Sequence, residues 1–135
     1  MANALYGKGR EKFLTGDIAW DTDNIRAALV DTASYTVAID TDEFLDDVPS
    51  GARVATSGNL TGKTTNLGVA DASNVTFSTV TGASIEAIVI YKHVTDDTDS
   101  PLIAYIDSAT NLPITPNGGD ITVAWDSGSN RIFKL

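Results

Sequence analysis

Two apolar runs in the second half of the chain constrain its fold most strongly. Residues 85–92 and 102–107 carry isoleucine, leucine, valine, alanine or tyrosine at both odd and even positions. Because successive side chains of a β-strand point to opposite faces of a sheet, such strands are buried on both faces. These runs therefore predict the central strands of a sheet. The residues that we expect to be mostly buried are Ile88, Val89, Ile90, Ile106 and Trp125.

Alternating patterns and turn residues predict two hairpins. Residues 24–30 and 35–39 each alternate along the chain, and a turn-like segment between them would join them as one hairpin. A further strand is expected over residues 121–125. The turn at 127–130 predicts the second hairpin, in which residues 131–135 pair with that strand.

The remaining sequence adds only short elements. Residues 50–74 are poor in large apolar groups, so we expect no more than edge strands there, near Val54 and over residues 60–65. A single helical turn is expected over residues 41–45, and a strand begins at Val75. A total of about seven to eight short strands favours an all-β fold, either a β-sandwich or a jelly roll.

Residues 1–16 form a distinct segment, which we interpret as an N-terminal arm ahead of a single β-sandwich domain over residues 17–135. Apolar residues recur in the segment at helical spacing, but Gly7 and Gly9 would each cost a helix about 1 kcal/mol relative to alanine. We therefore expect a flexible arm that protrudes from the body and ends in a short helical turn. Deletion of residues 1–12 should then leave a folded body.

The charge of the chain is unevenly distributed. The net charge is −9, yet the arm is basic, with three cations and a single glutamate in its first twelve residues. The acidic body repels phosphate, so nucleic-acid binding is not expected. Apolar and aromatic side chains are interleaved with the cations, and they either contact a partner or fold back onto the protein's own core. The residues that we predict to contact a partner are Tyr6, Lys8, Arg10, Lys12, Phe13 and Leu14.

Residue types that carry chemistry are scarce. The chain has no cysteine and one histidine, His93, and neither a nucleophile elbow nor a P-loop occurs. Asp96, Asp97 and Asp99 lack the glycine and the distal glutamate of an EF-hand loop. We therefore predict that the protein is not an enzyme and needs no metal or cofactor. No apolar run reaches the roughly 18 residues of a membrane span and no signal-peptide pattern is visible, so we expect synthesis in a cytoplasm and no membrane partner.

Three segments of the sequence carry a family resemblance. They are residues 5–14 (LYGKGREKFL), residues 54–60 (VATSGNL) and the closing part from PNGGD at 116–120 to FKL at 133–135. These segments resemble small virion proteins of tailed bacteriophages, and most closely the capsid decoration, or cement, proteins. The resemblance implies a β-sandwich or jelly roll on the capsid exterior, where a trimer or dimer clamps neighbouring subunits of the major capsid protein. It implies no site residues, because this group has no defining site motif.

A second hypothesis is a tail, fibre or receptor-binding module that recognises host surface glycans. Carbohydrate sites commonly stack sugars against exposed aromatic rings. Trp20 and Trp125 are the only tryptophans, and Trp125 falls on the apolar face of its predicted strand. The location of the protein on the virion distinguishes this hypothesis from a capsid role.

Overall fold

The structure of the protein is a computed structural model, which describes residues 3–135. Strands dominate it, and they are accompanied by one α-helix and four short 3-10 helices. The strands are β1 (Ala4–Leu5), β2 (Ile25–Val30), β3 (Arg53–Thr56), β4 (Val69–Ala70), β5 (Val75–Phe77), β6 (Ala87–Lys92), β7 (Leu102–Ile106), β8 (Ile121–Val123) and β9 (Phe133–Lys134). The helices are α1 (Gly7–Thr15), η1 (Leu45–Asp47), η2 (Ser50–Ala52), η3 (Asn66–Gly68) and η4 (Asp97–Asp99).

The longest strands form one antiparallel sheet in the order β1-β7-β6-β2-β3. β6 lies at its centre, with all six of its residues paired to β2. This arrangement confirms the prediction from the two apolar runs, because β6 and β7 are both inner strands. Ile88, Val89 and Ile90 are buried as predicted, whereas Ile106 and Trp125 are only half-buried.

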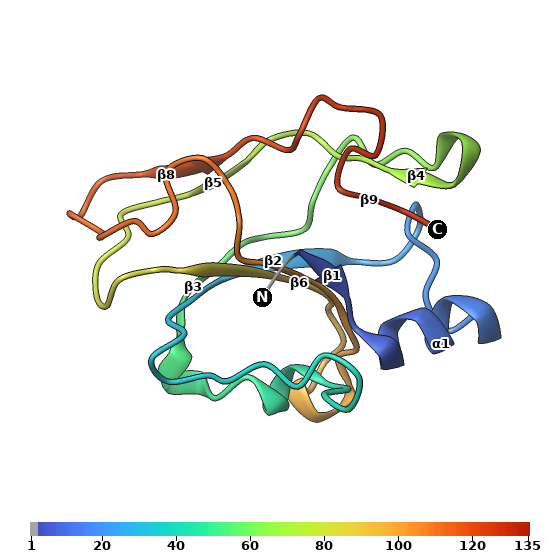
Figure 1. The fold of residues 1–135 in the computed structure, drawn as a ribbon, viewed down its shortest axis with the longest axis horizontal. Coiled ribbons are helices and arrows are strands. Elements are labelled where there is room, and N and C mark those ends of the chain that lie inside the picture. The colour runs from blue at the N-terminus through green and yellow to red at the C-terminus, as the bar shows by residue number, and fades with distance from the viewer. Residues whose placement is uncertain (1–2) are drawn as a thin grey trace.

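Each face of the central sheet is covered by a separate layer (Figure 1). The loop-covered face carries Ala28, Val30, Val89 and Leu102, which pack against the irregular segment over residues 31–52. The ribbon-covered face packs against two short antiparallel ribbons, β4–β9 and β5–β8. The alternation of side chains along β2 and β6 explains why both faces of these strands are apolar.

The structure confirms a largely β fold but not the complete second sheet of a sandwich or jelly roll. Within the described residues, the second layer consists of two separate two-stranded ribbons. Residues 60–65 contain only an isolated bridge from Thr64 to Asp71 instead of a strand. The expected helical turn over residues 41–45 is displaced to η1, where the Asp47 carboxylate accepts hydrogen bonds from the N–H groups of Glu43 and Phe44.

Both predicted hairpins are wrong. Residues 35–39 form no strand, because β3 and β6 already occupy both edges of β2. Their apolar side chains instead cover the sheet as part of the loop layer. β9 leaves β8 and pairs with β4, where the Phe133 ring meets Trp20 edge to face at 5.2 Å. β8 pairs with β5, so the C-terminal segment is paired, as expected, but with a different strand.

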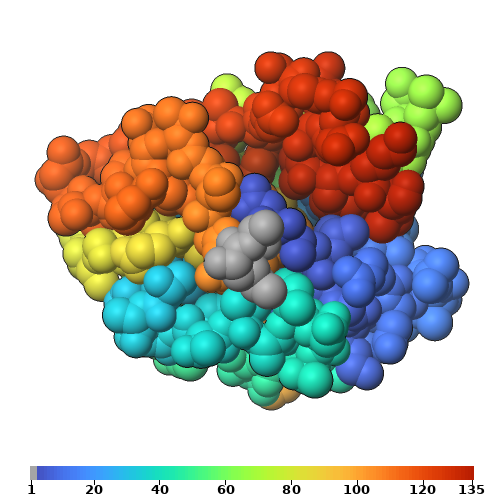
Figure 2. Space-filling view, in the orientation of Figure 1, coloured from blue at the N-terminus to red at the C-terminus, as the bar shows by residue number. Residues whose placement is uncertain are grey.

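The N-terminal segment from residue 3 onward does not protrude as an arm. β1 pairs with β7, and α1 packs against the same strand. In the space-filling view this segment lies flush with the body, between the C-terminal part and the loop layer (Figure 2). Gly9 explains the close approach, since a Cβ there would lie 2.5 Å from the carbonyl oxygen of Leu102. The glycine that argued for flexibility therefore permits contact between a helix and a strand.

Candidate contact surfaces

The three cations of the predicted contact surface are paired within the protein's own fold. Each lies within 4.0 Å of a carboxylate, so the acidic partners on α1 and in the loop layer neutralise the patch. Lys12 also lies over the Phe44 ring, 4.9 Å from its centroid. The pairs are Lys8–Glu11 at 3.4 Å, Arg10–Asp40 at 3.8 Å and Lys12–Glu43 at 2.8 Å.

Tyr6 belongs to the core rather than to a contact surface. Its side chain is fully buried, and its hydroxyl lies 2.9 Å from that of Tyr35. The Tyr35 hydroxyl donates to the Asp42 carboxylate at 2.7 Å, so the Tyr6 hydroxyl donates to Tyr35. Burial is the main cause that raises the pKa of both phenols above the usual value. This chain of hydrogen bonds joins the N-terminal segment to the loop layer.

The two apolar residues at the end of α1 have different environments. Phe13 is half-buried, and its ring centroid lies 5.8 Å from that of Phe133 on β9. Leu14, the next residue, leaves 88% of its surface exposed. Of the six predicted contact residues, Leu14 is thus the one large apolar side chain that faces solvent.

Leu14 belongs to an apolar end of the molecule that sequence reasoning missed. Among the described residues, the large apolar side chains with strong exposure are Leu14, Leu67 at 88% and Leu135 at 60%. Leu135 donates a backbone hydrogen bond to Gly68, the neighbour of Leu67, and α1, β4 and β9 lie at the same end of the fold (Figure 1). We call Leu14, Leu67 and Leu135 the leucine end.

The leucine end also has an unusual backbone conformation and, within residues 3–135, an unpaired cation. Leu67 has a φ of 54°, which is uncommon for a residue other than glycine, asparagine or aspartate. The backbone therefore adopts an unfavourable conformation at the residue that presents the exposed leucine. Nearby, Lys134 is exposed, and its ammonium group makes no ion pair or hydrogen bond with the described part of the chain. Leu67, one of two leucines within the polar residues 50–74, was the available sequence signal.

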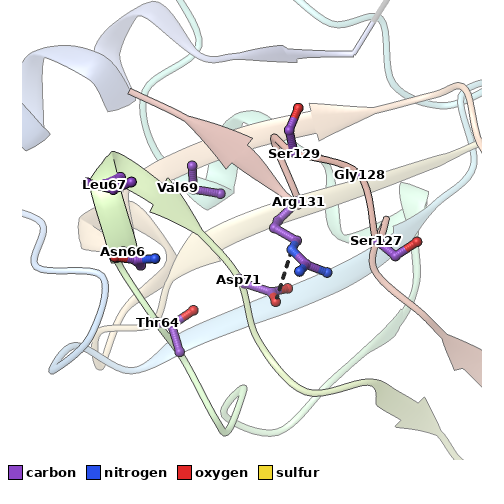
Figure 3. Close-up of a pocket in the computed structure, with 9 residues that line it drawn as sticks. All are labelled: Thr64, Asn66, Leu67, Val69, Asp71, Ser127, Gly128, Ser129 and Arg131. Atoms are coloured by element: carbon purple, nitrogen blue, oxygen red, sulfur yellow. Dashed lines mark ion pairs between the residues drawn. The ribbon is translucent and has the colours of Figure 1, made fainter.

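A polar pocket of about 370 Å³ adjoins Leu67. It lies between the segment that leads into β4 and the loop before β9 (Figure 3). Arg131 reaches across it toward Asp71, with 4.0 Å between Nε and the carboxylate. The hydroxyls of Thr64, Ser127 and Ser129 add further polar groups around this stretched ion pair.

A larger groove of about 780 Å³ opens between the central sheet and β8. Its lining is mixed, with isoleucine, valine and leucine side chains below polar and acidic residues. Ile106 and Trp125, the two expected core residues that are only half-buried, both line this groove. These two residues are therefore only half-buried because they line the groove.

No cation site or membrane-spanning helix emerges from the part of the chain that is described. Residues 3–135 contain no group of three or more histidine, aspartate or glutamate side chains placed to hold a metal ion. Asp97, from the acidic cluster singled out in the sequence, pairs with Arg53 at 2.8 Å. No helix within the same range is long and apolar enough to cross a membrane.

The chain matches no protein-family model and no curated protein.

Proposed function

We propose that this protein is a structural component of a tailed-phage virion, which binds the capsid exterior and clamps neighbouring subunits of the major capsid protein. The observation that carries the proposal is the leucine end, where Leu14, Leu67 and Leu135 remain exposed. Large apolar side chains that stay exposed at one end of a small protein are candidates for an interaction site. The resemblance of three sequence segments to decoration proteins supports the choice of the major capsid protein as the partner.

The charge of the protein supports an attachment through this end. The chain carries −9 overall, so most of its surface repels other acidic surfaces. The leucine end combines apolar side chains with Lys134, which makes no ion pair among residues 3–135. Attachment would therefore be driven by apolar burial and weakly assisted by one cation. The paired cations of α1 contribute less than the sequence suggested.

Decoration of isolated shells tests the proposal. Purified protein is mixed with expanded shells of the same phage, and bound protein is measured by co-sedimentation and located by cryo-EM. We expect Leu14→Asp and Leu67→Asp to reduce occupancy by about tenfold or more, because each places a charge in a buried contact. Thr36→Asp, an exposed position in the loop layer, is the matched control and should bind normally.

The location of the density decides the outcome. Density for the protein on the outer shell, at sites between capsid subunits, would agree with the proposal. Density on the tail alone would contradict it. Decorated particles should also resist heat and osmotic shock better than undecorated ones, because a protein that binds only the assembled shell stabilises it by mass action.

A second candidate function is a tail, fibre or receptor-binding module that recognises host surface glycans. The polar pocket beside Leu67 favours it, since Asp71 and Arg131 offer an acceptor and donors to neighbouring hydroxyl groups. Trp20 is buried and offers no ring for stacking. Glycan-array binding that is lost in Asp71→Asn, while shell decoration remains absent, would favour this candidate over a capsid role.

A further inference from the structure

The larger groove has the geometry of a slot beside an open strand. Its floor is formed by side chains of the central sheet, including Leu29, Ile88 and Ile106. One wall is residues 120–126 in unbroken succession, and the opposite wall is residues 108–112. Because alternate side chains of a strand point in opposite directions, an unbroken run indicates that the backbone edge itself lines the groove. In Figure 1, the segment that forms the opposite wall runs from the end of β7 to the layer of the two ribbons.

The edge that lines the groove is unpaired. β8 pairs with β5 in a sheet of only two strands, so its second edge has no strand beside it. Residues 124–126 make no backbone hydrogen bond to another backbone group within residues 3–135. Two-stranded ribbons are marginal on their own, and an open edge is a template for a further strand.

Several apolar side chains that line the groove are only partly covered by the described part of the protein. Ile106, Ile121, Val123 and Trp125 are half-buried, whereas Tyr35, Leu45 and Val48 in the layer over the other face are buried almost completely. A strand laid along β8 would place alternate side chains over this floor and satisfy the open backbone edge at the same time. Backbone pairing of this kind supplies affinity, and the alternate side chains supply specificity.

Charge at the rim defines the chemistry of that strand. Asp120 and Asp126 lie exposed at the two ends of the edge, and Asp120 accepts a hydrogen bond from the Thr79 N–H group. Arg131 also lines the groove, but it faces Asp71 at 4.0 Å. The rim is therefore acidic at both ends, which favours lysine or arginine at the ends of the incoming segment.

A second copy of the chain is a poor source of such a segment. It carries the same net charge of −9, so approach of two copies is opposed at long range. Every strand within residues 3–135 is already paired in the fold on at least one edge, so none of them is a free extended segment. The occupant must instead be a chain with an available extended segment.

We propose that the groove binds an extended segment of a shell subunit, apolar at alternate positions and basic at its ends, which adds to β8 as a third strand. The preference for such a strand follows from the groove alone. Its assignment to a shell subunit rests on the proposed function. The groove and the leucine end are then two separate contacts, as a clamp between neighbouring subunits requires.

Titration with a synthetic peptide tests the preference of the groove. The probe is a blocked seven-residue peptide of alternating valine and threonine with lysine at each end, added to the ¹⁵N-labelled full chain and followed by NMR. We expect saturable shifts in residues 121–126 and 108–112 and slower hydrogen exchange along β8. Methylation of the central backbone amides of the peptide should abolish binding, because it removes the donors for pairing.

Charge variants sharpen the test. The double change Asp120→Asn and Asp126→Asn should lower the affinity for the lysine peptide by about fivefold, as expected for the loss of two exposed ion pairs. The control pair Asp96→Asn with Asp99→Asn changes the net charge equally at exposed positions around η4 and should leave affinity unchanged. Thermal melts of both pairs verify that the fold is retained.

Three results would overturn the proposal. Absence of saturable shifts would show that the groove does not accept a strand, whatever the outcome of shell decoration. Shifts confined to α1 would place binding elsewhere. Sedimentation equilibrium that reveals a dimer, broken by the Asp120 and Asp126 changes or by the peptide, would make a second copy the occupant. Shell decoration that fails while the peptide binds would overturn the proposed function and leave the groove's preference intact.

Discussion

The two faces of the central sheet differ in how completely they are closed. On the loop-covered face, the covering side chains of Tyr35, Leu45 and Val48 are buried, although the covering layer has almost no regular structure. On the ribbon-covered face, Val123 and Trp125 remain half-buried beside an open groove, although the cover consists of strands. A cover made of regular strands therefore does not bury its side of the core more completely than an irregular cover does. Side-chain fit and specific hydrogen bonds close one face, and the other is left open where we propose that a partner binds.

Polar anchors explain why an irregular layer covers its face so tightly. The buried pair of Tyr6 and Tyr35 continues to Asp42, which also accepts a hydrogen bond from the Ala38 N–H group at 2.9 Å. Ser100 is 1% exposed, and its carbonyl oxygen accepts a hydrogen bond from the Leu45 N–H group at 2.8 Å. Such bonds replace the ladder that a strand would have provided, because buried backbone groups must find partners.

Deletion of residues 1–12 is the strongest test of the closed face. It removes Tyr6, strand β1 and most of α1. Loss of one fully buried aromatic side chain costs about 3–5 kcal/mol, which approaches the whole stability of a small domain. We expect the truncated chain to be unfolded, contrary to the expectation for a protruding arm. Circular dichroism and urea denaturation check this, and a cooperative transition like that of the full chain would contradict the structure.

Two valine changes compare a residue of the central sheet beneath the loop layer with a residue that lines the groove. Val89→Ala on the loop-covered face should reduce the free energy of unfolding by roughly 2–3 kcal/mol, from two lost methyl groups plus a cavity. Val123→Ala at the groove should cost less than about 1 kcal/mol, because the side chain is already half-exposed. Urea melts followed by tryptophan fluorescence measure both. Equal losses would mean that the groove is closed in solution.

Two phenylalanine changes probe the hydrogen bonds of the closed face. Tyr35→Phe leaves the buried Tyr6 hydroxyl without its acceptor and removes a donor from Asp42, which should cost about 1–3 kcal/mol. Tyr6→Phe removes one donor and leaves Tyr35 bonded to Asp42, so about 1 kcal/mol is expected. The order of the two losses in urea melts is the decisive measurement. A larger loss for Tyr6→Phe would reverse the donor assignment.

The same contrast explains what the sequence could predict. The strands of the central sheet were predictable because apolar residues on both faces exclude most other structures. β4 and β9 have two residues each, too few for any pattern to emerge. The sequence favoured a flexible role for Gly9, because the residue that packs against it, Leu102, is 93 positions away in the chain. The pairing of Lys12 with Glu43, which neutralises the predicted basic patch, is likewise a consequence of tertiary contact.

Glu86 offers the smallest and most specific test, through pH. It lies one residue before β6, and its carboxylate accepts hydrogen bonds from Ser84 and from the N–H and hydroxyl groups of Thr32 at the entry to the loop layer. Burial favours the neutral acid, but these hydrogen bonds outweigh burial and lower the pKa of Glu86. Because the folded pKa lies below the unfolded value of about 4.3, the charged carboxylate stabilises the fold above that pH, and this stabilisation is lost as the pH falls through the folded pKa.

Glu86→Gln should therefore cost about 1 kcal/mol at pH 7, and the difference from the natural chain should shrink as the pH falls below about 4. The exposed Glu11→Gln, which loses only the surface pair with Lys8, is the matched control and should change little at either pH. Urea melts at pH 7 and pH 3 measure both variants. A difference for Glu86→Gln that is the same at both values would show that its carboxylate does not hold the loop layer to the sheet, and that apolar packing alone closes this face.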